Sequence, residues 1–158
     1  MRRTLTALVI LTLAVSLSGC GAGKNASTRQ VTQVTDGVES AITENGNKIK
    51  LVNVLVVETA TGAGVLVGTL VNALPEQDTL LGIAINGQVA TFTGKNTLTQ
   101  NSPVIFEGAS ANAKAVLPVL GAKAGQHVQV TMFFARAGEV TVQAIIRDQR
   151  DTYAGITA

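Results

Sequence analysis

The most reactive side chains in this 158-residue sequence are one cysteine, Cys20, and one histidine, His127. A lone thiol cannot form an intramolecular disulfide, but it can be alkylated or acylated. A lone imidazole cannot build a zinc site, which needs three or four nitrogen, sulfur or carboxylate ligands. We therefore expect chemistry first at Cys20, and His127 is the one candidate metal ligand.

The residues around Cys20 predict that it is lipidated. A basic start is followed by an apolar run from about Leu5 to Leu17, which is typical of a secretory signal. The run is too short to span a bilayer, which takes roughly 20 apolar residues. It ends in the sequence LSGCG at residues 17–21, which resembles the lipobox of bacterial lipoproteins. The resemblance implies that the thiol takes up a diacylglyceryl group and that a peptidase cuts between Gly19 and Cys20.

Lipidation implies that the mature protein is held at the outer, extracytoplasmic face of the cell membrane. Two or more acyl chains, at about 0.8 kcal/mol per buried CH₂, anchor a soluble domain essentially permanently. The alternative is a plain secretory signal with a chance cysteine. Residues 1–19 form the predicted signal peptide. Residues 20–46 form the predicted lipidated end and flexible tether, because they lack a sustained apolar stripe, although Val38 to Ile42 could form a weak strand or turn.

Charge and motifs exclude several function classes. The chain has 12 basic and 10 acidic residues, and Arg2 and Arg3 belong to the signal, so the mature protein is close to neutral. Nothing suggests steering toward nucleic acid. The sequence lacks a nucleotide-binding loop, a nucleophile elbow and a cluster of metal ligands. Glu76 and Asp78 lie in an expected turn, where Asp side chains usually bond to the backbone. We expect a protein that is not an enzyme and has no cofactor.

Residues past Gly46 predict strands. Short alternating or continuous apolar runs are separated by turn residues, and no helix of useful length is expected. Asn86-Gly87 is the strongest hairpin signal, and it should pair the following strand back onto the preceding one. Seven or eight strands in an antiparallel sandwich or barrel are expected over residues 47–147, followed by a polar tail over 148–158. The expected strands are residues 48–58, 65–73, 79–85, 88–93, 104–106, 113–120, 127–134 and 139–147.

The last of these hairpins, GQHVQVTMFFARAGEVTV at residues 125–142, resembles the closing segment of the PCuAC family of periplasmic copper chaperones. Residues 67–72 and 78–82 also look like that family's strand, Asn-turn and Asp-x-Leu segment. The similarity covers about residues 48 to 147. It implies an all-β, antiparallel Greek-key sandwich of cupredoxin-like or immunoglobulin-like type. It also implies a Cu(I) site made of histidine and methionine side chains on one rim.

The positions of that copper site carry other residues here. Counting back from Gly125, the family's His-x-Met pair falls at Asn112 and Lys114, and its earlier histidine falls near Phe92 or Thr93. Cu(I) selects thiolate, thioether or imidazole ligands, and an ammonium would add positive charge to the site. We therefore do not expect copper at this rim.

Two soft side chains remain, His127 and Met132. They are five residues apart in one expected strand, so they should face opposite sides of the sheet. The chain also resembles actinobacterial lipoproteins of the LpqE type, which combine such a domain with a lipobox ending Gly-Cys-Gly-Ala-Gly.

The leading hypothesis is a lipid-anchored, non-catalytic β-sandwich that binds another component of the cell envelope, such as a protein partner. Loops at a sandwich end usually carry function, so the candidate binding rim contains Lys95, Asn112 and Lys114. A copper or metal chaperone with a relocated or degenerate site is the alternative, and the rim loops could instead be merely solvated. The sequence does not specify the partner or the oligomeric state.

Overall fold

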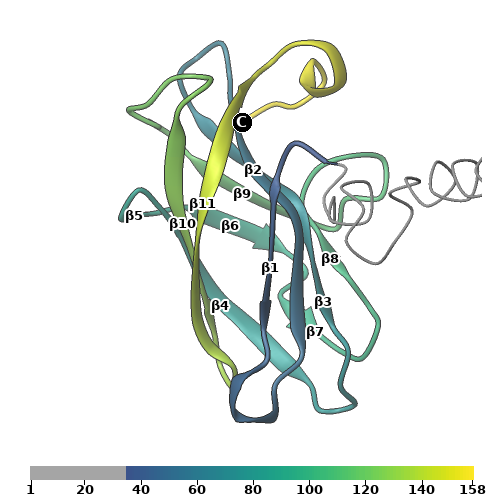
Figure 1. Cartoon of the computed structure of the whole chain (residues 1–158). Coiled ribbons are helices and arrows are strands. Elements are labelled where there is room, and N and C mark those ends of the chain that lie inside the picture. Colours follow the sequence, from purple (N-terminus) through teal and green to yellow (C-terminus); the bar gives the residue numbers. More distant parts are fainter. Residues whose placement is uncertain (1–34) are drawn as a thin grey trace, which may run out of the picture. The chain divides into compact units, whose positions relative to one another are not determined.

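The framework of the fold is a long antiparallel pair of strands, β2 and β3, in the computed structural model, which describes residues 35 to 158 (Figure 1). β1 and the end of β11 pair with one edge of β2, while β8 and β9 pair with β3 and β6 pairs with β9. The strands proper to this first sheet are β1 (Val38–Ile42), β2 (Ile49–Glu58), β3 (Gly64–Asn72), β6 (Thr91–Gly94), β8 (Val104–Ile105) and β9 (Ala113–Leu117).

The second sheet has the order β5-β4-β10-β11 and is antiparallel throughout. β11 joins the two sheets, because its first part pairs with β10 and its last three residues run parallel to β2. The second-sheet elements are β4 (Asp78–Ile85), β5 (Gln88–Val89), β7 (Thr97–Leu98, paired with β4), β10 (His127–Phe134) and β11 (Gly138–Asp148). Two short 3₁₀ turns, Glu44–Gly46 and Asp151–Tyr153, complete the described elements.

The second half of β2, which follows a bulge at Asn53, is buried on both faces. Asn53 has a φ of 53°, and the register with β3 shifts at this point. Beyond the bulge, Val54 and Val56 join the main core between the sheets, while Leu55 and Val57 join a second cluster on the outer face. The sequence of residues 54–57 is apolar at every position because side chains on both faces of this segment are buried.

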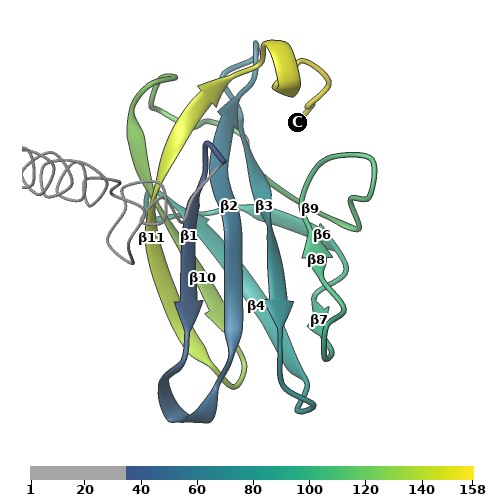
Figure 2. The ribbon, with the colours of Figure 1, turned by 45° about the vertical axis from the view of Figure 1, so that its right-hand side comes forward.

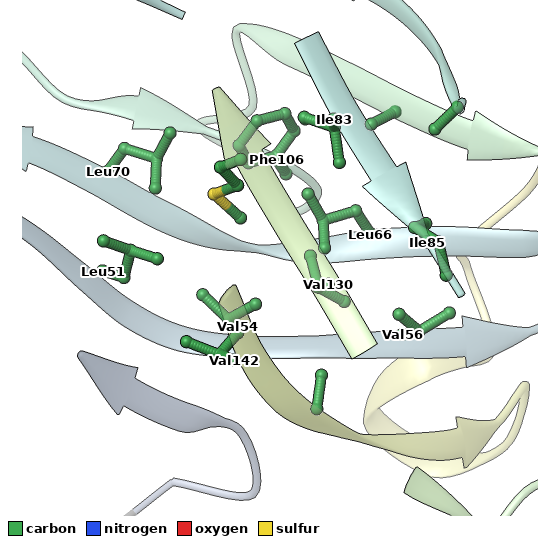
Figure 3. Close-up of a cluster of buried hydrophobic side chains, with 14 of the residues drawn as sticks. Leu51, Val54, Val56, Leu66, Leu70, Ile83, Ile85, Phe106, Val130 and Val142 are labelled. Atoms are coloured by element: carbon green, nitrogen blue, oxygen red, sulfur yellow. The ribbon is translucent and has the colours of Figure 1, made fainter. Parts of the chain in front are cut away.

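The main core lies between the two sheets and is almost entirely aliphatic (Figure 3). Burying each large side chain contributes about 1.5–3 kcal/mol relative to leaving it exposed. Contributions come from both sheets, with one aromatic ring from the segment after β8. The labelled members are Leu51, Val54, Val56, Leu66, Leu70, Ile83, Ile85, Phe106, Val130 and Val142.

The architecture confirms the predicted all-β sandwich. The closing hairpin follows the predicted alternation: Val128, Val130, Met132 and Phe134 are buried, while His127 is exposed. β3 is flanked by strands on both edges, as its continuous apolar run predicted. The structure divides the described residues into eleven strands rather than seven or eight, because several pairing segments are only two residues long.

Three expectations differ from the structure. The strand after Asn86-Gly87 pairs back onto β4 for only two residues, and then Ala90 turns inward and the chain crosses to the first sheet as β6. Val38–Ile42, for which a weak strand or turn within the tether was expected, is a strand paired with β2. Residues 148–158, the expected polar tail, include the end of β11 and the buried side chain of Ile156. The alternation of apolar and polar residues records burial within one strand, so it does not predict burial by segments that are distant in the sequence.

The predicted signal peptide, the cleavage site at Gly19, the lipidated Cys20 and the tether up to residue 34 lie outside the described residues. In the described part, residues 35–158, no helix is long and apolar enough to cross a membrane.

Candidate functional site

β6 and β9 bring together the positions at which the family resemblance placed copper ligands. Thr93 pairs directly with Lys114 across the two strands. Asn112 immediately precedes β9, and its carbonyl oxygen accepts a hydrogen bond from the backbone N–H of Lys95 at 2.8 Å. Residues two apart in an extended segment project to the same side. The structure thus places Lys95, Asn112 and Lys114, which we call the rim, at neighbouring positions of β6 and β9 or directly beside them.

Gly94 allows the two strands of the rim to meet closely. Its φ is 91°, a left-handed conformation that favours glycine. A Cβ at this position would lie 2.4 Å from the carbonyl oxygen of Asn112. Any side chain would therefore push β6 away from the start of β9.

Two of the three rim side chains, those of Lys95 and Asn112, make hydrogen bonds within the fold. Lys95 Nζ donates to Ser102 Oγ at 2.6 Å and to the carbonyl oxygens of Ser102 and Pro103, each at 3.2 Å. Asn112 Nδ2 donates to the Pro103 carbonyl oxygen at 3.0 Å, and its Oδ1 accepts from the Ile105 N–H at 2.9 Å. These bonds fasten the segment before and within β8 onto the rim.

The chemistry of this donor set does not fit Cu(I). The matching positions present the hydroxyl of Thr93, the amide of Asn112 and the ammonium of Lys114, whereas Cu(I) prefers thiolate, thioether or imidazole ligands. The other matching position, Phe92, packs its ring against Phe106, with ring centroids 6.0 Å apart. The rim therefore offers no soft ligand.

His127 and Met132 do not form a substitute site. His127 is exposed at the start of β10, whereas Met132 is 1% exposed and packs into the main core, so the predicted opposite orientation is confirmed. β10 also belongs to the second sheet, not to the sheet that carries the rim. Across residues 35–158, no three His, Cys, Asp or Glu side chains gather in a group that could hold a metal ion.

Asp78 has the structural role predicted for it. Its side chain is 2% exposed, and its carboxylate accepts hydrogen bonds from the backbone N–H groups of Arg136 and Ala137, each at 2.9 Å. It also accepts from the N–H of Thr79 at 2.7 Å. These bonds tie β4 to the turn between β10 and β11.

A hollow beside the rim was missed by sequence reasoning. It has a volume of about 220 Å³, and its lining includes residues of the C-terminal segment and of the loop between β8 and β9. Figure 2 shows the backbones of these two segments on the same side of the folded unit. The only sequence signal was the Val54–Val57 run, which requires cover on the outer face as well. The lining includes Asn53, Val67, Glu107, Thr152, Tyr153 and Ile156.

Glu107 gives this hollow its charge. Burial raises the pKa of its carboxyl, and the electrostatic attraction of Lys114 opposes part of that effect. Among the described residues, the carboxylate has no hydrogen-bond partner. The backbone of Glu107 has a φ of 75°, which is rare for a residue with a long side chain.

The start of the folded unit is fastened next to the hollow. Asn53 Oδ1 accepts a hydrogen bond from the Gly37 N–H at 2.8 Å. The Asp36 carboxylate accepts a hydrogen bond from the Tyr153 hydroxyl at 3.2 Å and forms an ion pair with Arg147 at 3.4 Å. Two residues that line the hollow, Asn53 and Tyr153, therefore hold the chain where it emerges from the predicted tether.

Three large apolar side chains are exposed on β4, β5 and β10, which are neighbouring strands of the second sheet. Leu81 is 65% exposed, Val89 81% and Phe133 38%. Val89 pairs with Ala84, and Phe133 pairs with Gly82. Gly82 has no side chain that could cover the ring of Phe133. We call the surface of Leu81, Val89 and Phe133 the apolar face.

No protein-family model and no curated protein matches the sequence. Solved structures do match. The copper-bound PCuAC domain from PmoF2 is 22% identical, with a TM-score of 0.55 over 70% of this chain and 98% of that chain. The apo PCuAC domain from PmoF1 is 18% identical, with a TM-score of 0.57 over 70% and 99%. The apo PmoF2 PCuAC domain is 17% identical, with a TM-score of 0.56 over 72% and 98%. Together with the observed sheet order, these similarities show that the folded unit has the fold of the PCuAC domains.

Proposed function

We propose that this chain is a membrane-tethered, non-catalytic binding domain of the cell envelope, built on a PCuAC-like fold without copper at the rim. The observation that carries the proposal is the apolar face of Leu81, Val89 and Phe133. Apolar surface gathered on one face marks interaction sites more often than isolated exposed residues do. The side chains of Lys95 and Asn112 are engaged internally, so the apolar face is the proposed contact surface.

A crosslinking pull-down with the lipid-anchored protein tests the contact surface. A double variant, Leu81→Ser with Phe133→Ser, should lose a partner that the unchanged protein recovers from envelope extract. Val119→Ser is the matched control, because Val119 is 69% exposed but lies in the loop after β9, outside the apolar face. Recovery of no partner, or equal loss with Val119→Ser, would contradict the proposal.

The tether is supported by the lipobox-like sequence that ends at Cys20. Metabolic labelling with a radioactive fatty acid should label the protein, and Cys20→Ser should abolish the label and release the protein from the membrane fraction. Label that persists in Cys20→Ser would exclude this cysteine as the attachment site.

A copper chaperone with a relocated site is the second candidate, because one similar solved structure is a copper-bound PCuAC domain. Isothermal titration of residues 21–158 with Cu(I) and with Cu(II) separates the two functions. This soluble form contains the compact unit of residues 35–158 with its own hydrophobic core. Tight stoichiometric copper binding that His127→Ala abolishes would favour the chaperone. No copper binding would favour the non-catalytic binding domain.

A further inference from the structure

The hollow at the C-terminal segment combines apolar walls with a carboxylate. Val67, Tyr153 and Ile156 belong to the second hydrophobic cluster and also line the hollow. Sites for drug-sized ligands span roughly 300–1,000 Å³. A hollow of about 220 Å³ therefore suits a shorter ligand.

Glu107, which lines the hollow, has a constrained backbone. A left-handed conformation costs a residue with a Cβ about 1–2 kcal/mol, and Glu107 adopts it with a φ of 75°. The preceding residue is fixed by the hydrogen bond from the Phe106 N–H to the Gly68 carbonyl at 2.9 Å. Strained backbone of this kind often occurs at ligand-binding positions.

The nearby charges decide the sign of a ligand. Glu107 is the only charged residue that lines the hollow, and within the described residues its carboxylate makes no hydrogen bond. Lys114 acts on that carboxylate electrostatically from β9, without an ion pair among the described contacts. A cation that reaches Glu107 thus gains a charge-assisted hydrogen bond, against some repulsion from Lys114.

We propose that the hollow binds a primary alkylammonium group, with the methylene chain against Val67 and Ile156 and the ammonium on the Glu107 carboxylate. The group is carried either by a free amine or by the lysine side chain of a partner. The site depends on neither the lipid anchor nor the apolar face, so it goes beyond the proposed function.

NMR titration of isotopically labelled residues 21–158 tests the site, with n-butylammonium as the free amine and Nα-acetyl-lysine methylamide as the lysine side chain. Uncharged n-butanol is the matched ligand. The amide signals of Val67, Thr152 and Ile156 should shift with saturation in the millimolar range, on the order of 1–10 mM. Saturation with both cations assigns the hollow to lysine side chains as well as free amines, and saturation with n-butylammonium alone assigns it to free amines.

Two variants separate binding from mere proximity. Glu107→Gln should weaken the ammonium ligands about tenfold and leave n-butanol unchanged, because only the charge-assisted bond is lost. Lys114→Met should strengthen them, because it removes the competing cation. Shifts that scatter over the surface, that do not saturate with either cation, or that are equal in Glu107→Gln and the unchanged protein would overturn the proposal.

Discussion

Lys95 and Asn112 converge on one acceptor: Lys95 Nζ and Asn112 Nδ2 both donate to the carbonyl oxygen of Pro103, at 3.2 and 3.0 Å. The two side chains come from the two strands' ends at the rim and hold the segment that leads into β8. The rim at which the family resemblance placed copper ligands is here a structural junction.

The first prediction concerns the copper positions. Replacing three of them together, as Thr93→His, Asn112→His and Lys114→Met, should raise the affinity of residues 21–158 for Cu(I) by about a hundredfold. The physical reason is that Thr93 and Lys114 are paired across β6 and β9, so the new ligands would share one side of the strand pair. Competition titration against a Cu(I) chelator measures the gain.

Thr93→His alone is the control for this prediction, because one imidazole cannot make a stable Cu(I) site. If the triple variant binds no better than the single one, the alignment of the rim with the copper positions is wrong.

The second prediction concerns the buried carboxylate of Asp78. Asp78→Asn should destabilise the fold by about 2 kcal/mol. The carboxylate now accepts hydrogen bonds from two backbone N–H groups of one turn, and the amide NH₂ of asparagine would face one of these N–H groups without being able to accept from it. Arg136 and Ala137 supply those N–H groups from the β10–β11 turn. Urea unfolding measures the loss. Glu76→Gln is the matched control, since Glu76 is exposed and its change should stay within about 0.5 kcal/mol. Equal effects from both variants would show that Asp78 does not hold the turn.

Much of the sandwich could be predicted because period-two alternation records local burial. The faces of β10 follow directly from the alternation between Val128 and Phe134, and the pairing of β3 on both edges follows from its continuous apolar run. The family resemblance placed copper positions at Asn112 and Lys114 and near Phe92 or Thr93, and the structure has these positions on the paired strands β6 and β9 or directly beside them.

The features that could not be predicted from the sequence depend on contacts between segments that are distant in the chain. Ala90 shows no local sign that the chain will change sheets there. Ile156 is the only large aliphatic residue among residues 148–158, and it packs in a cluster with Leu55, Val57 and Val65 of β2 and β3. The hollow at Glu107 arises from that packing, so no local pattern predicts it.

The third prediction concerns the entry of the chain into the folded unit. Gly37 is buried, and a Cβ there would lie 2.4 Å from the carbonyl carbon of Asn53. Gly37→Ala should therefore destabilise the fold by about 1–3 kcal/mol, as overpacking does, and loosen β1. Urea unfolding and amide hydrogen exchange over β1 measure both effects. Gly155→Ala is the control, because its Cβ would meet nothing within 4 Å. Unchanged hydrogen exchange in β1 would show that the close contact between Gly37 and Asn53 does not hold this strand.

The fourth prediction concerns pH and uses two carboxyls with opposite behaviour. Burial raises the pKa of Glu107 above its ordinary value of 4.5, so the folded state disfavours the ionised carboxylate. The difference in stability between the unchanged protein and Glu107→Gln should be constant below that ordinary value, and as pH rises through the raised pKa the unchanged protein should lose stability relative to the variant.

Glu58 should show the reverse. Its carboxylate accepts hydrogen bonds from Lys123 Nζ at 2.6 Å and from the Ala124 N–H at 3.0 Å, and these bonds lower its pKa. Glu58→Gln should therefore be less stable than the unchanged protein at neutral pH, and the difference should disappear as pH falls through the lowered pKa. Urea unfolding at a series of pH values measures both slopes. Because the two carboxyls share the same fold, any general effect of acid cancels in the comparison. Slopes of the same sign for the two variants would contradict the assigned environment of at least one of them.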